Sequence, residues 1–296
     1  MNGLDPRMNA FRPDLADAGL RGKVDADRFA EGTKYRVVAA AAPLKRVPRP
    51  DAPLDSEVLR GEVFSIFDET AEGWSWGQLE TDSYVGYVPT EALGSPAPEP
   101  THLVATLRTF IYPGPDLKLP ALGALSIECR VTLAGETETR GTLYRHLVGG
   151  EGAVIAAHVR PLDALHEGDF VAVAERFVET PYLWGGRTSL GLDCSALVQL
   201  SLMACGHTAP RDTDLQEKML GAPVERGIAG ELTRGDLVFW QGHVGILIDR
   251  QHMVHASGHH MTVVIEPLAD AVERIARKHG PPTSVRRLAL PARQPQ

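Results

Sequence analysis

Cysteine, long apolar runs and a signal sequence are what this chain most obviously lacks. It has three Cys among 296 residues, an odd number and too few for a disulfide framework. No apolar run approaches the roughly 18–20 residues that a membrane-spanning helix needs. Residues 1–22 mix three aspartates with their apolar side chains and do not read as a secretory signal. We therefore expect a cytoplasmic protein with no membrane partner.

An excess of positive charge is also absent. The 30 Lys and Arg face 38 Asp and Glu, and the net charge of -8 argues against a nucleic-acid partner, because phosphate binding requires clustered cations. The chain is 43% hydrophobic and has the length of two or three domains of roughly 100–200 residues each. Its 29 Gly and 22 Pro are typical of short strands and turns rather than of a helical bundle.

The first half of the chain is predicted to be all β. Residues 1–32 are polar without a sustained period, and we expect an arm that either lies over a neighbouring domain or is mobile. Residues 33–93 hold short β-rich runs separated by turn residues, which predicts a small barrel. Residues 94–100 contain three prolines and form a linker, because Pro cannot continue a sheet ladder. Residues 101–165 predict a second barrel of the same kind.

The two β-rich segments also end on comparable text, YVGYVPTEAL and AAHVRPLDAL. This is a weak internal repeat, which leaves open whether the segments are two copies of one module. The strand-turn-strand run that ends in D-x-Y-V-G-Y-V resembles bacterial SH3-like domains, and the resemblance covers residues 33–165.

Residues 166–296 combine helices with strands, which predicts an α+β domain. Residues 168–179 place apolar side chains at helical spacing after Asp169, a residue suited to cap the helix. Residues 194–206 read as a nearly all-apolar, buried helix that stops at a glycine. Four short strands are expected at 236–240, 243–248, 253–257 and 262–267.

Cys194 opens the buried helix, directly after Asp193. The unpaired N–H groups and the positive end of the helix dipole favour a thiolate there and can receive an oxyanion. The alternative is a small core residue, which is how we interpret Cys129 and Cys205.

Two downstream histidines favour the catalytic interpretation. His243 begins one predicted strand and His255 lies inside the next, 12 residues later. A hairpin that turns near 249–252 brings both rings to one cleft, where His243 serves as the base and His255 orients it. The remaining histidines of this region are expected in solvent: His252, His259 and His260.

A zinc site is the rival explanation for one Cys and several His. Its usual signature is a pair of ligands at C-x2-C or H-x3-H spacing. The sequence has no such cysteine pair, and the His259–His260 doublet would point to opposite faces of a strand. We therefore expect no metal and no cofactor.

Five motifs follow one another in a fixed order: PYLWGG, DCSALV, RDT, GDLVFW with HVGI, and MVHAS. The series resembles the NlpC-type cysteine peptidases of papain-like fold over residues 166–280. The resemblance implies that Cys194 is the nucleophile, His243 the base and His255 the third member of the triad.

The same resemblance implies supporting roles for three further residues. Tyr182 matches a tyrosine that helps to stabilise the oxyanion, and Asp193 and Ser195 match positions that shape the substrate pocket. Ala196 replaces a frequent glycine, a change of one methyl group. The connection before His243 is only Gln241-Gly242, which gives the cleft less cover on that side.

Taken whole, two SH3-like modules before this domain resemble the γ-D-glutamyl-L-diamino acid endopeptidases. In that subgroup a carboxylate recognises the free amine of an N-terminal L-Ala, since a buried ammonium needs a partner. Asp212, flanked by Arg211 and Thr213, matches that carboxylate, and its alternative role is a surface helix cap. By motif, Glu57 and Tyr84 match a Glu and a Tyr that reach the cleft from an SH3-like module, although Tyr84 also fits a plain strand aromatic.

The sequence thus predicts an α+β papain-like peptidase behind two SH3-like barrels. Its expected substrate is a small murein peptide, L-Ala-γ-D-Glu-diamino acid, without a nucleic-acid partner. An exported hydrolase of intact wall and a non-catalytic wall-binding protein are the alternatives. The preferred diamino acid and the oligomeric state stay open.

Overall fold

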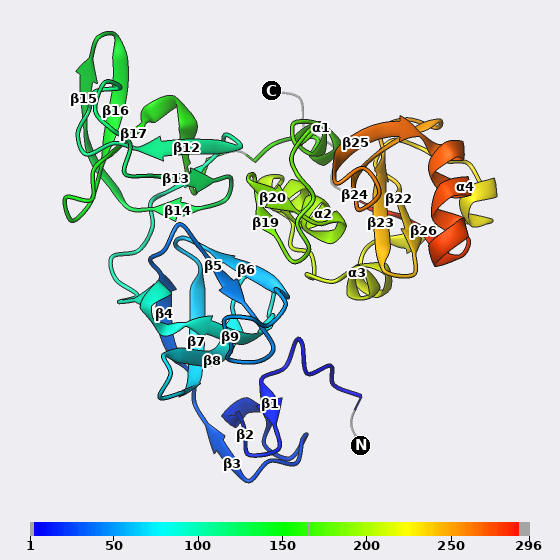
Figure 1. The fold of residues 1–296 in the computed structure, drawn as a ribbon, viewed down its shortest axis with the longest axis horizontal. Helices are drawn as coiled ribbons and strands as arrows, with labels where there is room; N and C mark the ends of the chain where they lie inside the picture. Colours follow the sequence, from blue (N-terminus) through cyan, green and yellow to red (C-terminus); the bar gives the residue numbers. More distant parts are fainter. Residues whose placement is uncertain (1–2, 165, 290–296) are drawn as a thin grey trace. The chain divides into compact units, whose positions relative to one another are not determined.

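The computed structural model describes residues 3–164 and 166–289 and divides after Ala164 into two compact units (Figure 1). The described part of the N-terminal unit is built from strands and short 3-10 turns, and the C-terminal unit combines α-helices with a sheet. The predicted start of the arm at residue 1, the predicted end of the second barrel at residue 165 and the predicted end of the peptidase domain at residue 296 lie outside the described residues.

The first β-module spans residues 33–94. Its main sheet is antiparallel, in the order β10-β4-β7-β8-β9, and β5 pairs with β6 in a separate hairpin. Alternate residues of β7, Phe64 and Ile66, face the core. The strands are β4 (Thr33–Val37), β5 (Ala41–Leu44), β6 (Ser56–Leu59), β7 (Val63–Glu69), β8 (Trp74–Leu79), β9 (Val85–Pro89) and β10 (Leu93–Gly94), with the 3-10 turn η2 (Thr90–Ala92).

The second β-module, residues 102–161, repeats this order of elements. A hairpin again follows the first strand, and a closing strand after a 3-10 turn again pairs with that first strand, β18 with β11. The internal repeat is therefore visible in the topology, with β7 replaced by two pieces, β14 and β15. The elements are β11 (His102–Val104), β12 (Arg108–Ile111), β13 (Gly123–Ser126), β14 (Arg130–Val131), β15 (Leu133–Thr139), β16 (Thr142–Leu147), β17 (Ala153–Ile155), η3 (Ala156–His158) and β18 (Val159–Pro161).

The N-terminal arm packs on the first β-module. Its apolar residues Ala10 and Leu15 contact Trp76, and the Arg12 guanidinium lies 4.5 Å from the centroid of the Trp76 ring. Arg12 also donates to the Tyr87 hydroxyl at 2.9 Å. Of the two expectations for the arm, the structure supports the one in which it lies over a domain. Its elements are β1 (Phe11–Arg12), β2 (Leu15–Asp17), η1 (Ala18–Leu20) and β3 (Arg28–Ala30).

The C-terminal unit is built on a six-stranded sheet in the order β21-β26-β22-β23-β24-β25. Residues 237–240, 244–247 and 253–257 are buried on both faces of the sheet. The four strands expected from the sequence are therefore confirmed. The strands of this unit are β19 (Arg187–Thr188), β20 (Gly191–Leu192), β21 (Ala222–Pro223), β22 (Leu237–Trp240), β23 (His243–Leu247), β24 (His252–Ser257), β25 (Thr262–Pro267) and β26 (Ser284–Arg287).

Two helices, α2 and α4, flank this sheet (Figure 1). Helix α2 is buried almost all round and contacts β23 and β24, whereas α4 packs only an apolar stripe that includes Ala271 and Ile275. The two helices predicted from the sequence are present, although α1 is shorter than expected. The helical elements are α1 (Phe170–Glu175), α2 (Cys194–Ala204), α3 (Thr213–Met219), η4 (Gly227–Ala229) and α4 (Leu268–His279).

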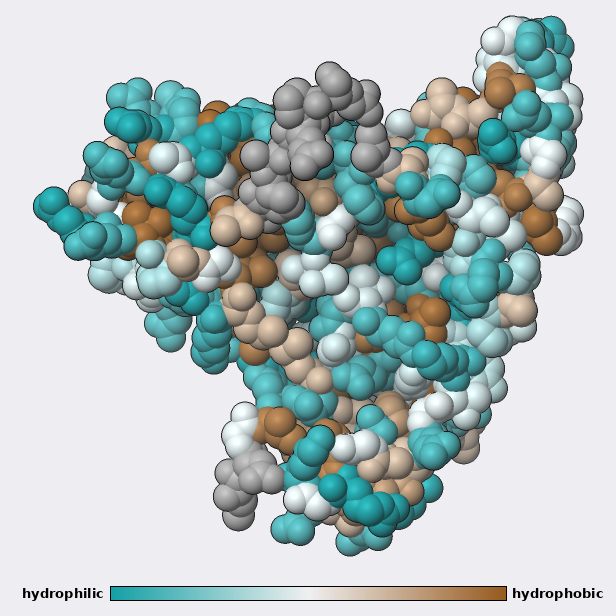
Figure 2. Space-filling view, turned by 180° about the vertical axis from the view of Figure 1, so that it is seen from behind, coloured by the Kyte–Doolittle hydropathy of each residue, from teal (hydrophilic) through white to brown (hydrophobic). Residues whose placement is uncertain are grey.

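The surface carries scattered rather than massed apolar side chains on the face seen in Figure 2, where hydrophobic and hydrophilic residues alternate. Trp184 and Leu190 are the most exposed large apolar residues in the described part of the C-terminal unit. No helix within residues 3–164 or 166–289 has the length and hydropathy to cross a membrane.

Candidate active site

Cys194 is the first residue of α2, and the helix start fixes its position. The Asp193 carboxylate caps the helix by accepting from the Ala196 N–H at 2.9 Å. The Cys194 sulfur in turn accepts hydrogen bonds from the backbone N–H groups of Ser195 and Val244. Val244 directly follows His243 on β23, so the thiol lies against the start of that strand.

The electrostatics of Cys194 differ from the sequence expectation of a thiolate. Burial raises the pKa of the thiol to about 12, and the Asp193 carboxylate acts in the same direction. The two backbone N–H groups and the Arg211 guanidinium oppose this rise without cancelling it. The expectation was therefore wrong for the resting protein: the thiol is neutral, and its proton must leave as the sulfur attacks.

A buried ion pair supports the cysteine from behind. Both nitrogens of the Arg211 fork bind Asp193, at 2.9 and 2.8 Å, and Arg211 also donates to the Ser195 hydroxyl at 2.8 Å. The Arg211 side chain is only 1% exposed. Asp193 further accepts from the Gly185 N–H at 3.0 Å. Asp193, Ser195 and Arg211, expected around the substrate pocket, thus bind one another and hold the turn that carries the nucleophile.

His243 and His255 meet across neighbouring antiparallel strands, as the predicted hairpin requires. His243 Nε2 lies 2.7 Å from His255 Nδ1. A Cβ at Gly245 would lie 2.0 Å from the Met253 Cε atom and 3.5 Å from the His255 Cβ atom. A side chain at this position would therefore have to displace Met253 from its place beside His255.

Both imidazoles are neutral at pH 7. Burial lowers the pKa of His243 well below its usual value, and the neighbouring His255, His279 and Arg274 lower it further. Burial also lowers the pKa of His255, against the opposing effect of Glu266. A neutral imidazole is the form that accepts a proton, so the histidine pair is ready to act as a base.

Glu266 and Arg274 extend this pair, and neither was predicted from the sequence. His255 Nε2 lies 2.6 Å from Glu266 Oε1, and Arg274 binds both oxygens of Glu266 at 2.5 Å. Val264 lies opposite His255 on β25, so Glu266 is a diagonal neighbour on the same face, within reach of a long side chain. These bonds lower the pKa of Glu266 to about 2. Glu266 is therefore ionised.

Tyr182 lies close enough to Cys194 for ionisation of one group to be felt by the other. Its backbone N–H donates to the Met261 carbonyl at 2.9 Å and its strand segment runs beside Leu192, two residues before the cysteine. Burial raises the pKa of the Tyr182 hydroxyl, and Cys194 and Asp193 act in the same direction. The phenol therefore stays protonated, which is the form that can donate a hydrogen bond to an oxyanion.

Asp212 precedes α3, and the segment around it is bonded to the nucleophile's turn. Gln216 donates to the Ser195 carbonyl at 2.9 Å, while Arg211 binds the Ser195 hydroxyl. The Asp212 side chain makes no capping hydrogen bond to the helix that starts at Thr213. Its alternative interpretation, a helix cap, therefore lacks the bond that defines a cap.

Glu57 and Tyr84 belong to the first β-module. Glu57 is half-buried on β6, opposite Pro43. Tyr84 is buried in the module core with Leu44 and Val88 among its neighbours. This is the position that its alternative interpretation, a structural aromatic, predicts. A contact of Glu57 or Tyr84 with substrate stays a prediction.

The remaining cysteines and histidines lie outside this arrangement. Cys129 is buried in the second β-module, and Cys205, half-buried, follows the last residue of α2. His259 and His260 are exposed, and His252, the half-buried first residue of β24, pairs with Asp249 of the preceding turn. Within the described ranges, no three His, Cys, Asp or Glu side chains converge as metal ligands do.

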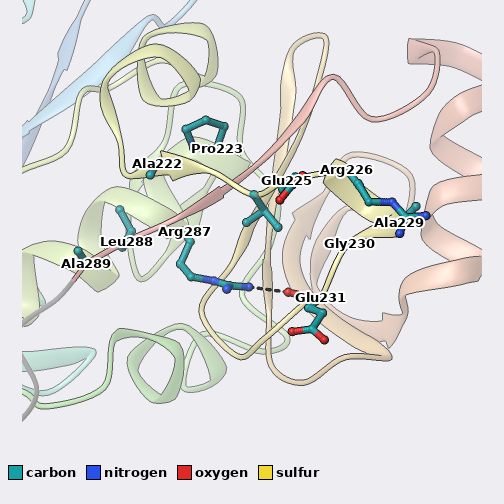
Figure 3. A pocket seen from close by; sticks show the side chains of 11 residues that line it. Ala222, Pro223, Glu225, Arg226, Ala229, Gly230, Glu231, Arg287, Leu288 and Ala289 are labelled. Carbon is teal, nitrogen blue, oxygen red and sulfur yellow. Dashed lines mark hydrogen bonds between the residues drawn. The ribbon is translucent and has the colours of Figure 1, made fainter.

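A pocket of about 730 Å³ lies elsewhere in the C-terminal unit (Figure 3). It is lined from β21, η4 and β26, and the Arg287 side chain crosses it to donate to the Glu231 carbonyl at 2.7 Å. None of the predicted site residues lines this pocket. Its walls carry no nucleophile and base pair, so it is not where the peptidase chemistry takes place.

Comparison with known proteins agrees with this geometry. Residues 44–93 match the bacterial dipeptidyl-peptidase Sh3 domain, and residues 179–275 match the NlpC/P60 family. Dipeptidyl-peptidase 6 of Lysinibacillus sphaericus is 27% identical over 238 residues, which cover 75% of this chain and 86% of the relative. The γ-D-glutamyl-L-lysine dipeptidyl-peptidase of Bacillus cereus is 25% identical over 254 residues, 73% of this chain and 71% of the relative.

A solved structure shares the fold as well. An NlpC/P60 family protein from Bacillus cereus superposes with a TM-score of 0.70 at 21% sequence identity, covering 87% of this chain and all of the other. The predicted α+β class is confirmed. Motifs, fold and family matches lead to one identification: the C-terminal unit is a cysteine peptidase domain of the NlpC/P60 family, and the first β-module is a bacterial SH3-like domain.

Proposed function

We propose that this enzyme hydrolyses the γ-D-glutamyl–diamino acid bond of peptidoglycan-derived peptides with a free N-terminal L-Ala, in the cytoplasmic recycling of murein peptides. The names of the two long relatives support the substrate class, because both are dipeptidyl-peptidases and one name specifies γ-D-glutamyl-L-lysine. Cleavage after L-Ala-γ-D-Glu releases a dipeptide. The similarity spans about three quarters of this chain and so is not confined to the peptidase domain.

The chemistry follows from the neutral Cys194–His243 pair. The sulfur attacks the γ-D-glutamyl carbonyl carbon while the S–H proton moves to His243, and the protonated ring then gives that proton to the leaving amine. Water next loses a proton to His243 and attacks the acyl-enzyme, which frees the γ-carboxylate and regenerates the thiol. The protonated Tyr182 hydroxyl would stabilise the oxyanion by donating a hydrogen bond to it.

The observation that carries the substrate assignment is the position of Asp212. It sits between two residues that bind Ser195, the neighbour of the nucleophile, and its carboxylate does not cap α3. A dipeptidyl-peptidase must bind the free amine of its substrate at a fixed distance, two residues, from the bond that it cleaves. A carboxylate next to Arg211, which binds Ser195 beside the cysteine, would meet that requirement by pairing with the substrate ammonium.

The test compares L-Ala-γ-D-Glu-meso-diaminopimelate with its N-acetylated form. Blocking the amine removes a charged partner, and such mismatches cost about 2–5 kcal/mol, or roughly 30- to several-thousand-fold in kcat/KM. Asp212→Asn should slow cleavage of the free peptide and narrow the gap between the two peptides. Asp214→Asn, which removes the same charge on the exposed side of α3, is the matched control and should change neither.

A wild-type enzyme that cuts both peptides equally well would rule out this proposal. The preferred function would then be hydrolysis of intact wall by an exported enzyme, since stem peptides in the wall have no free L-Ala amine. A tight-binding protein without cleavage of either peptide would instead favour a wall-binding role.

A further inference from the structure

The active site contains more than the three residues of a cysteine–histidine–histidine triad. Behind His243, a continuous chain of contacts leads through His255 to Glu266 at 2.7 and 2.6 Å, and Arg274 binds both oxygens of Glu266 at 2.5 Å. The chain starts on β23, crosses β24 and β25 and ends on α4. Glu266 is only slightly exposed, so solvent screens these contacts weakly.

The chemistry of each partner fixes where the protons lie. Arg274 can only donate and an ionised Glu266 can only accept. His255 must therefore carry its proton on Nε2, which leaves the Nδ1 lone pair to accept from His243. His243 then carries its proton on Nε2, and its Nδ1 holds the lone pair. That nitrogen is the one not bonded to His255, and it remains for the thiol of Cys194.

We propose that Glu266, held by Arg274, is a positioning residue that sets the tautomers of both histidines and so makes Nδ1 of His243 the proton acceptor. Without the carboxylate, a neutral His255 can carry its proton on Nδ1. It would then donate to Nε2 of His243, and the proton of His243 would move to Nδ1, where it blocks acceptance of the thiol proton. The inference rests on the cysteine mechanism of the proposed function and is independent of the free-amine specificity.

The charges of Glu266 and Arg274 act on the histidines in opposite directions. Glu266 raises the pKa of His243 and His255, and Arg274 lowers both. His279, which bonds to the Gln241 carbonyl, also lowers the pKa of His243. The charged or titratable groups outside the pair that act on the two rings are His260, Glu266, Arg274 and His279.

The first experiment measures steady-state kinetics of Glu266 variants. Glu266→Ala should lower kcat by roughly 10- to 100-fold with KM nearly constant, as loss of a partner that orients a catalytic ring does. Glu266→Gln should recover most of kcat, because its amide oxygen still accepts from His255 Nε2–H. Glu273→Gln on the exposed face of α4 is the matched control and should match wild type. Equal kcat in wild type and Glu266→Ala would overturn the proposal.

A double-mutant cycle separates positioning from general damage to the fold. If Glu266 acts only through the ring of His255, Glu266→Ala should add no loss of kcat in a His255→Asn background. A purely structural role for Glu266 would instead lower kcat by the same factor in both backgrounds. Additive losses in this cycle would contradict the proposal even if both single variants are impaired.

The third measurement needs no substrate and so stands apart from the proposed specificity. Alkylation of Cys194 by iodoacetamide depends on His243, whose protonated form cannot accept the thiol proton. Glu266→Gln should move the acid limb of the alkylation rate to lower pH, and Arg274→Gln should move it to higher pH, each by roughly 0.5–1 unit. Glu273→Gln and Arg277→Gln, the matched exposed pair, should leave it in place. Shifts in the same direction for Glu266→Gln and Arg274→Gln would overturn the proposal.

Discussion

Two arginine–carboxylate pairs stand behind the two reacting groups, and they perform different tasks. Arg211 binds Asp193 behind the nucleophile, and Arg274 binds Glu266 behind the base. Asp193 also accepts hydrogen bonds from the backbone N–H groups of Gly185 and Ala196 and from the Ser195 hydroxyl, all within the turn that carries the nucleophile. Glu266, by contrast, is hydrogen-bonded to the imidazole of His255. The first pair therefore fixes the path of the chain, whereas the second sets the position of protons.

Their burial differs in the same sense. The Arg211 side chain is 1% exposed, whereas that of Arg274 is 22% exposed. The Arg211–Asp193 pair holds the backbone, and it can be fully buried because it does not change after the chain has folded. The Arg274–Glu266 pair, which contacts the histidines that transfer protons, is more exposed because Arg274 lies on α4. The comparison predicts that the nucleophile pair matters more for stability and the base pair more for the proton chemistry.

The largest effect should follow from removing either reacting group. Cys194→Ala and His243→Ala should each lower kcat by on the order of 10⁴-fold or more, because nucleophile and base act as a unit. The double variant should be no slower than either single variant. Peptide-release assays check this, and full activity in Cys194→Ala would remove the cysteine mechanism altogether.

The next largest effect concerns the stability of the nucleophile pair. Arg211→Met leaves the Asp193 charge buried and unpaired, which should cost about 3–5 kcal/mol in the free energy of unfolding of the C-terminal unit. Arg274→Met, at a more exposed pair, should cost less. Arg277→Met at a 73% exposed side chain should stay within about 0.5 kcal/mol of wild type. Calorimetry measures all three, and a greater loss for Arg274 than for Arg211 would reverse the comparison.

The half of the site that is local in sequence is the half that could be predicted. Cys194 at the start of a buried helix follows from neighbouring residues, and the hairpin that joins His243 to His255 follows from two adjacent strand patterns. Glu266 lies inside a strand that was also predicted. Its role depends on the register of β25 against β24, which places it diagonal to His255, and register is not readable from the strand pattern alone.

The structure differs from the sequence prediction at helix α4 and at the protonation state of Cys194, and both differences have physical reasons. Helix α4 was not predicted, although Leu268, Ala271, Val272 and Ile275 show the i, i+3, i+4, i+7 spacing that would have indicated it. The prediction of a thiolate at Cys194 was based on the helix terminus, which is a local feature. It did not include the burial of the thiol, which depends on how the helix packs against the sheet. The arm packs through Trp76, a partner far away in sequence that no local pattern identifies.

His255→Asn should have a moderate effect because it tests the link between the base and its carboxylate. The Asn side-chain oxygen can still accept from His243 Nε2–H and hold the tautomer, so we expect a loss in kcat of roughly 10- to 100-fold rather than the 10⁴-fold of His243→Ala. The same kinetic assay with His255→Ala should show a larger loss. Equal and complete loss in His255→Asn and His243→Ala would mean that His255 contributes to structure or reacts directly.

The smallest expected effect is that of pH near neutrality. Its acid side reports on His243 and its alkaline side on Cys194. The pKa of His243 lies well below its usual value, so the base is already neutral at pH 6.5 and loses activity only as pH falls through that lowered pKa. The pKa of Cys194 is about 12, so the thiol stays protonated through pH 8 and contributes no alkaline limb there. The kcat/KM of wild type should therefore change by less than about 2-fold between pH 6.5 and 8. An acid limb centred near pH 6.5 would show that His243 is better solvated, and an alkaline rise through pH 8 would show a thiol that ionises on its own.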